Sequence, residues 1–186
     1  GCALAAAEYN VDITLCGDES VLKRVLADEG ITDTRIEIAH APQVISMEDD
    51  PHCILKEKSD SSMALGQRLL ARGAGDAFVT AGSTGAALIG ATLLVKRIKG
   101  IKRAALATIL PTAGGPCLLI DCGANVVCRP EFLHQFAMMG SVYMRHIEGI
   151  ESPRVGLVNN GAEKTKGMPL QVESYELMSK SGRYNF

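Results

Sequence analysis

Short apolar runs that suit β-strands alternate along the whole chain with stretches that carry apolar residues at helical spacing. Residues 11–16 form a β-rich run, and residues 19–29 then place their apolar side chains on one helical face before Gly30. Such alternation is typical of an α/β fold with the helices packed on a sheet. The sequence therefore predicts an α/β fold with a largely parallel sheet flanked by helices.

The same periodicity predicts the remaining elements. The first ten residues are expected to end a helix that feeds the first strand, since their apolar stretch is too short for a signal peptide. Further strands are expected at residues 34–39, 77–81, 106–110, 117–121 and 155–159. Further helices are expected at residues 60–72, at 84–98, after Pro130 and after Pro169. The buried stripe of the helix after Pro130 is expected to consist of Phe132, Phe136, Met139, Tyr143 and Ile147.

Composition excludes some classes of function. The formal net charge is -2, only 4% of residues are aromatic and Trp is absent, which argues against a nucleic-acid-binding surface. No run approaches the roughly 20 apolar residues that span a bilayer. The six cysteines form no CxxC pair and stand mostly in apolar surroundings, so we expect reduced thiols in a cytoplasmic protein.

A glycine-flanked hydroxyl pair stands at the junction of a predicted strand and a predicted helix. Gly82 and Gly85 enclose Ser83 and Thr84, and the helix is expected to begin at once. Glycines let backbone N–H groups face a ligand, and a helix N-terminus favours an anion. The segment matches neither a Walker A loop nor GxGxxG. It therefore predicts either a phosphate site or an ordinary helix cap.

Polar residues follow two further predicted strands. Asp121 and Asn125 come after the strand at 117–121, at the sheet edge where α/β folds collect ligands. For Asp121 we favour a structural role, with its carboxylate bonded to turn amides; the role of Asn125 stays open. Asn159 follows the strand at 155–159.

Lysines close the set of candidate residues. Lys164 and Lys166 lie in the loop after Asn159, and a lysine beside Gly167 can offer a positive charge to phosphate or an oxyanion. The alternative is a solvated loop, and Lys56 and Lys58 ahead of a helix carry the same ambiguity. The four histidines form no metal or catalytic motif, and His134 and His146, on one predicted helix, are expected to be packing or surface residues.

Three segments together resemble the bacterial phosphate acyltransferases of the PlsX type. The first segment, GDAFVTAGSTGA, resembles that family's GDAxxSAGxTGA. The second, LLIDCGANVVCRPEFLHQFAMMGSVYMR, is similar to DxGANxxxxPExLxQFAxMGSVYxR, and SPRVGLVNNGAEKTKG is similar to RVGLLNxGxExxKG. SSMALG, after the lysine pair, also fits. Ser83 stands where the family commonly has Asn, and the family's opening glycine–aspartate segment and later DGFxGN-like segment have no match here.

The resemblance implies an isocitrate/isopropylmalate dehydrogenase-like fold, of which residues 1–186 would be a partial domain. It also implies a homodimer that transfers a fatty acyl group from acyl carrier protein to inorganic phosphate in phospholipid synthesis, with no cofactor. Peripheral membrane association would belong to the intact protein. The implied catalytic residues are Lys166 and Asn125. The implied phosphate- or substrate-binding residues are Gly82, Ser83, Thr84, Gly85, Asn159, Lys56 and Lys58, and no metal ligand is expected.

Other readings share parts of this pattern. A phosphotransacetylase-like enzyme would use the same scaffold, whereas a decarboxylating dehydrogenase would need clustered Asp residues and a nucleotide-binding segment, neither of which is visible. A third reading is a binding fragment without catalytic activity. Turnover by residues 1–186 would favour an enzyme, and binding of phosphate or carrier protein without turnover would favour the fragment.

Overall fold

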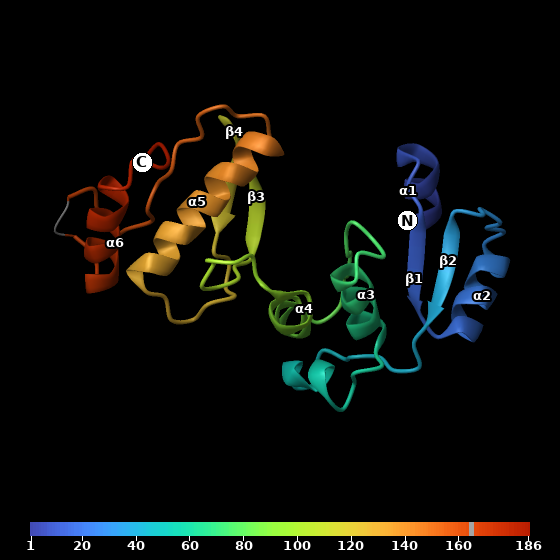
Figure 1. Cartoon of the computed structure of the whole chain (residues 1–186). Coiled ribbons are helices and arrows are strands. Elements are labelled where there is room, and N and C mark those ends of the chain that lie inside the picture. Colours follow the sequence, from blue (N-terminus) through green and yellow to red (C-terminus); the bar gives the residue numbers. More distant parts are fainter. Residues whose placement is uncertain (164–165) are drawn as a thin grey trace. The chain divides into compact units, whose positions relative to one another are not determined.

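The computed structural model describes residues 1–163 and 166–186, which form two compact units, Gly1–Arg97 and Ile98–Phe186. The first unit contains, in order, α1 (Cys2–Tyr9), β1 (Ile13–Gly17), α2 (Glu19–Asp28), β2 (Ile36–His40), η1 (Pro51–Leu55), α3 (Ser62–Ala71), α4 (Thr84–Gly90) and η2 (Ala91–Lys96). The second contains β3 (Ala107–Thr112), β4 (Gly115–Ile120), α5 (Pro130–His146) and α6 (Pro169–Ser179) (Figure 1).

A small parallel sheet opens the first unit. β1 and β2 pair in parallel, with Ile13 opposite Ile36, and α2 connects them. The start of α2 is fixed by Asp18, whose carboxylate accepts a hydrogen bond from the Val21 N–H at 3.0 Å. This arrangement confirms the helix, strand, helix and strand expected over the first 40 residues.

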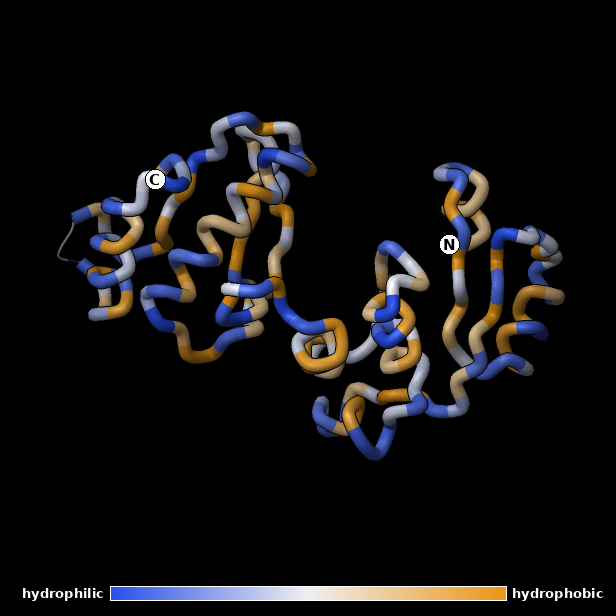
Figure 2. The backbone as a smooth tube through the Cα atoms, in the orientation of Figure 1, coloured by the Kyte–Doolittle hydropathy of each residue, from blue (hydrophilic) through white to orange (hydrophobic). Residues whose placement is uncertain are grey.

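The core of the first unit lies among η1, α3 and α4. Its buried members are Ile45, Cys53, Ile54, Met63, Ala64 and Ala86. Figure 2 shows the hydrophobic character of α4, which contributes to this cluster. The fully buried Gln67 of α3 donates from Nε2 to the Ala87 carbonyl at 2.9 Å. This bond between helices holds the segment that begins at Thr84 against α3.

An antiparallel hairpin and two helices build the second unit. β3 and β4 pair antiparallel, with Thr112 opposite Gly115, so a two-residue turn joins them. α5 packs on β4 at Gly140, where an added Cβ would lie 3.3 Å from Leu118 Cδ2, and α6 packs on α5. The α/β class and a small parallel sheet flanked by helices are confirmed, but the strands expected at 106–110 and 117–121 pair with each other in opposite directions.

Two expected strands do not form. Residues 77–81 and 155–159 are irregular. Arg154, just before the second run, forms an isolated bridge with Asn185. A strand forms where it lies beside another strand, and neither run is paired with a described sheet. Val79 is 91% exposed and Val158 is 79% exposed as a result.

The buried face of α5 also differs from the expected stripe. Phe132 and Phe136 are buried as predicted, but Tyr143 and Ile147 are exposed. Their places are taken by Ala137, Gly140 and Met144, since the small residues allow α5 to approach β4 closely. Among the described residues, no helix combines the length and apolar character needed to cross a bilayer.

Candidate functional site

In the first unit, the two hydroxyl residues between Gly82 and Gly85 have different roles. Ser83 is buried and caps α4, accepting a hydrogen bond from the Ala86 N–H at 3.4 Å. Thr84 is exposed at the first position of the helix. The first N–H groups of a helix have no acceptor within the helix itself. The exposed Thr84 and the adjoining backbone amides are thus the parts of the segment open to a ligand.

The two glycines serve packing as well. A Cβ on Gly85 would lie 2.8 Å from Pro51 Cγ, and one on Gly82 would lie 2.9 Å from Met63 Cε. The Gly82 N–H is already bonded to Thr80 Oγ1 at 3.1 Å. Gly85 therefore requires glycine for close packing against the Pro51 ring, whereas the flexible end of Met63 could shift away from a side chain at Gly82.

The two lysines ahead of α3 differ in their contacts. Lys58 forms an ion pair with Asp49 and donates to the Val44 carbonyl at 2.9 Å. The Asp49 carboxyl has a lowered pKa, with the Lys58 hydrogen bond as the largest cause. Lys56 is exposed, and no ion pair to another described residue occupies it. Lys58 thus has a structural role, and Lys56 is the better placed of the two for a ligand.

In the second unit, the Asp121 carboxylate organises the loop after β4. It accepts hydrogen bonds from the Leu106 N–H at 2.7 Å and the Asn125 N–H at 2.8 Å, with longer ones from Gly123 and Ala124. Partial burial disfavours the charged carboxylate, but these hydrogen bonds outweigh it, so the pKa of Asp121 lies below its usual value. The structural role predicted for Asp121 is confirmed.

Asn125 is held in the same network. Its side-chain Nδ2 donates to the Ala104 carbonyl at 2.9 Å, which ties the loop to the segment before β3. The side chain is partly buried. Asn125 and Asp121 together fix the segment 104–106 against the loop 121–125.

The loop that carries Lys166 is shaped by its own backbone and by Asn159. Asn159 donates from Nδ2 to the Lys166 carbonyl at 2.9 Å and accepts from the Asn160 N–H at 2.9 Å. The Lys166 N–H bonds to the Glu163 carbonyl at 2.9 Å. Gly167 has a φ of 102°, and a side chain there would overlap Asn159. Asn159 therefore positions Lys166, while Lys164 lies outside the described residues.

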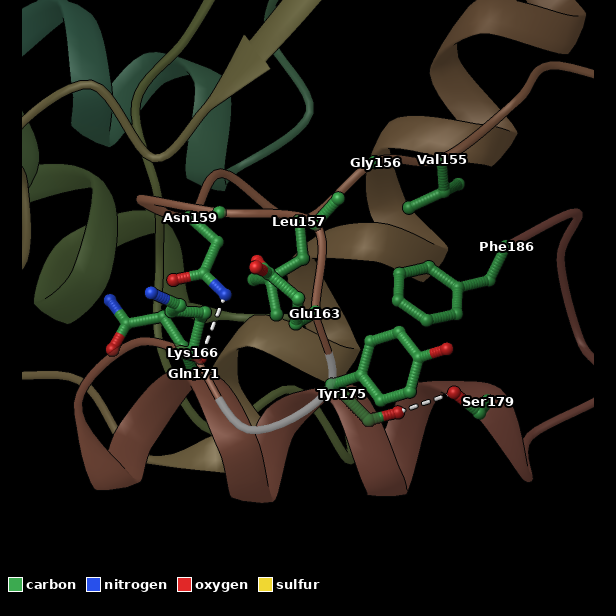
Figure 3. A pocket seen from close by; sticks show the side chains of 12 residues that line it. Val155, Gly156, Leu157, Asn159, Glu163, Lys166, Gln171, Tyr175, Ser179 and Phe186 are labelled. Atoms are coloured by element: carbon green, nitrogen blue, oxygen red, sulfur yellow. Dashed lines mark hydrogen bonds between the residues drawn. The ribbon is translucent and has the colours of Figure 1, made fainter.

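Lys166 and Asn159 line a pocket of about 470 Å³ that lies wholly within the second unit (Figure 3). Figure 3 shows Asn159, Lys166 and Gln171 gathered at one end of the pocket. Tyr175 and Phe186 lie at the other end, with their rings edge to face and 5.4 Å between centroids. The pocket thus has a polar end and an apolar end.

Sequence reasoning missed the wall that faces Lys166. Gln171 and Tyr175 are one helical turn apart on α6, and Phe186 closes the apolar end. The i, i+4 spacing places Gln171 and Tyr175 on one face of a helix, which is a signal available from sequence. The position of Phe186 depends on the Val155 N–H bond to the Asn185 carbonyl at 2.7 Å, a contact between distant segments.

The remaining titratable groups suggest no other centre. Among residues 1–163 and 166–186, no three His, Cys, Asp or Glu side chains cluster as metal ligands. His134 is in hydrogen-bond contact with Tyr184, with 2.7 Å between Nδ1 and the phenol oxygen. Burial, with a smaller effect from Arg183, lowers the pKa of His134. The packing role expected for His134 is thereby confirmed.

Comparisons with known proteins find similarity along the whole chain. A family model described as "Fatty acid synthesis protein" matches residues 1–186. A phosphate acyltransferase of Desulforamulus reducens is 45% identical over 177 residues, which are 95% of this chain and 53% of that protein. Those of Acetivibrio thermocellus and Dictyoglomus turgidum are 43% and 41% identical, over 97% and 100% of this chain and 54% and 56% of their own. The chain spans about half the length of these curated relatives.

The Asp121 network predicts a stability change with a defined pH dependence. Asp121→Asn should lower the free energy of unfolding by roughly 1 to 2 kcal/mol at neutral pH, because backbone N–H groups lose a charged acceptor that is partly exposed to solvent. The folded-state pKa is depressed, so this stabilisation is present above the unfolded pKa and is lost as the pH falls through the folded value.

Urea unfolding at a series of pH values measures the effect. The difference between the parent and Asp121→Asn should be constant near neutral pH and should shrink below about pH 4. Glu176→Gln, an exposed carboxylate on α6, is the control and should change stability little. An Asp121→Asn variant as stable as the parent at pH 7 would contradict the assigned role.

Proposed function

The chain belongs to the fatty acid synthesis protein family, and we propose that it acts in the transfer of a fatty acyl group from acyl carrier protein to inorganic phosphate, giving acyl phosphate for phospholipid synthesis. The observation that carries the proposal is the similarity to phosphate acyltransferases, at 41–45% identity over 95% or more of the chain. The matching sequence segments lie within the same aligned region. The chain covers about half the length of these relatives, so the activity is proposed for the whole protein that its open reading frame encodes.

The chemistry of this reaction is compatible with the candidate residues of the chain. A phosphate oxygen attacks the thioester carbonyl, the C–S bond breaks, and the carrier thiolate leaves as acyl phosphate forms. Phosphate is already anionic at neutral pH, so no Ser or Cys nucleophile is needed. A thiolate with a pKa near 8.5 leaves without a strong general acid. The protein has to hold both substrates and stabilise an oxyanion.

We propose the Gly82–Gly85 segment as the phosphate-binding element of the first unit, with Thr84 as its ligand group. Ser83 is committed to capping, whereas the Thr84 hydroxyl is exposed beside amides at a helix N-terminus. Lys56, which is exposed in the same unit, is proposed to add positive charge.

We propose Lys166 as the catalytic cation of the second unit. Its backbone is fixed by Asn159 and Glu163, and its side chain lines the pocket. There its ammonium would stabilise the oxyanion that develops on the thioester carbonyl. Asn125 is proposed to act through the loop that it holds, since its amide is engaged with Ala104 and it is not among the described residues that line the Lys166 pocket. On family grounds, we also propose a homodimer, a dehydrogenase-like sheet for the whole protein and a cytoplasmic location.

The reaction itself is tested with purified protein from the open reading frame that encodes the chain, alongside residues 1–186 alone. Long-chain acyl carrier protein should be consumed only when phosphate is present, with acyl phosphate as product. We expect residues 1–186 alone to be nearly inactive. Hydrolysis that does not depend on phosphate would refute the proposal, and a preference for acetyl-coenzyme A would favour a phosphotransacetylase-like enzyme.

The phosphate element predicts a selective change in Thr84→Val, which keeps the side-chain shape and removes the hydroxyl. The KM for phosphate should rise about fivefold to tenfold, since one hydrogen bond to an anion is lost, while the KM for acyl carrier protein should not change. Thr108→Val, on an exposed position of β3, is the matched control. An unaltered phosphate KM in a folded Thr84→Val variant would return the segment to an ordinary helix cap.

Lys166 predicts a loss of turnover without a loss of stability. Lys166→Ala should reduce kcat about a hundredfold, because removing one oxyanion-stabilising group typically costs about 3 kcal/mol. The exposed side chain predicts little change in the urea midpoint. Lys180→Ala, at the end of α6, is the control and should retain full activity. Equal, small losses in the two variants would leave Lys166 as surface charge.

A further inference from the structure

A buried glutamine joins α3 to α4 in the first unit. Gln67 is 2% exposed, and its amide Nε2 donates to the Ala87 carbonyl at 2.9 Å. Its Oε1 is buried as well and has no hydrogen-bond partner among the described residues. A buried oxygen that has lost water and gained no donor lowers the stability of the fold. Glutamine is therefore a costly residue at this position, and the cost requires an explanation.

The backbone of α4 is shaped to admit the Gln67 amide. A Cβ on Gly90 would overlap that amide and would lie 2.9 Å from Ile54 Cδ1. The Ala87 carbonyl accepts from the Ala91 N–H as well as from Gln67, and the helix widens from α to π turns at that point. A side chain that inserts into the hydrogen-bond ladder of a helix is a common cause of such a distortion. Glycine at position 90 and glutamine at position 67 thus form one fitted pair.

The other contacts at the start of α4 set its distance from its neighbours. The Gly82–Gly85 segment packs against the side chains of Met63 and Pro51. Apolar contacts are non-directional, so a helix held by them alone would slide or turn at little cost. A hydrogen bond has a defined distance and direction. The bond from Gln67 to Ala87 therefore fixes where α4 lies along and around its own axis.

We infer that Gln67 is a positioning residue for the phosphate element, an inference that rests on the proposed function. Ala87 comes about one turn after Thr84, and its N–H bonds to the Ser83 carbonyl at 3.0 Å. The hydrogen bond from α3 is therefore made to the same turn that presents the Thr84 hydroxyl. Hydrogen bonds weaken steeply when distance and angle change, so a small shift of this turn reduces the affinity for phosphate. The unpaired Oε1 is tolerated because an apolar side chain would not hold the turn in one place.

Gln67→Met tests this role, because methionine has a similar length and no hydrogen-bond donor. In the protein from the whole open reading frame, the KM for phosphate should rise about fivefold, while kcat and the KM for acyl carrier protein stay unchanged. The urea midpoint should change little, since the unpaired oxygen is removed and the Ala87 carbonyl keeps the Ala91 N–H. Arg72→Met introduces the same side chain at the exposed end of α3 and should match the parent throughout.

Combination with Thr84→Val shows whether Gln67 acts through the Thr84 hydroxyl. In a Thr84→Val background, Gln67→Met should raise the phosphate KM by less than about twofold, because the hydroxyl that it positions is already absent. Effects of the two substitutions that simply multiply would overturn the inference. An unchanged phosphate KM in the folded Gln67→Met variant would overturn it as well.

A second pair of variants tests the contact between the two helices. Gly90→Ala should lower the urea midpoint, because the added methyl group overlaps the Gln67 amide. In a Gln67→Ala background the same substitution should lower the midpoint much less, since the overlap is gone. An equal loss in both backgrounds would overturn the fitted pair on which the inference depends.

These kinetics separate the inference from the proposed function. A raised phosphate KM in Thr84→Val together with a parental phosphate KM in Gln67→Met would overturn the role of Gln67 and leave the proposed phosphate element standing. Absence of any phosphate-dependent acyl transfer by the parent would contradict the proposed function, and the inference with it. A loss that is selective for phosphate and depends on Thr84 supports both.

Discussion

The backbone N–H groups of the loop after β4 depend on one acceptor, the carboxylate of Asp121. Leu106, Gly123, Ala124 and Asn125 all donate to it. Without that carboxylate, several amides in a turn and at a strand entry would lack partners, which folded proteins rarely tolerate. The bond to Leu106 links the end of β4 to the start of β3, so the same group that closes the loop also aligns the hairpin on which α5 packs.

The elements that could be predicted from the sequence are those whose signals are local. α2 and α3 begin at the capping residues Asp18 and Ser61, and their apolar faces follow from periodicity. Strand pairing depends on distant residues and was predicted less well. The runs at 77–81 and 155–159 have strand-like composition, but neither is paired with a described strand, and local composition does not show whether a partner strand lies alongside. The antiparallel hairpin follows from its two-residue turn, a signal that the expectation of a parallel sheet overrode.

In the candidate site, as in the fold, the parts with local sequence signals could be predicted and the parts that depend on distant residues could not. The loop bearing Lys166 could be found from its sequence pattern, and its candidate cation does line the pocket. The opposite wall could not be found, since Gln171 and Tyr175 come from α6 and Phe186 arrives through pairing with the segment near Val155. The structure also changes the meaning of Asn159, whose amide is bonded to the Lys166 carbonyl. Positioning of the lysine is thus a role of Asn159 that the sequence did not predict, beside the proposed phosphate binding.

The two candidate elements have different physical characters, which bears on which substrate each receives. The Gly82–Gly85 segment offers a hydroxyl and helix N-terminal amides, all of them donors suited to an anion. Among the described residues that line the pocket around Lys166, Glu163 carries the one carboxylate and Lys166 the one ammonium, so the lysine is the group there that can meet an anionic oxygen. The Gly82–Gly85 segment is therefore proposed for the phosphate and the Lys166 ammonium for the oxyanion, which assigns the two kinds of negative charge to separate groups.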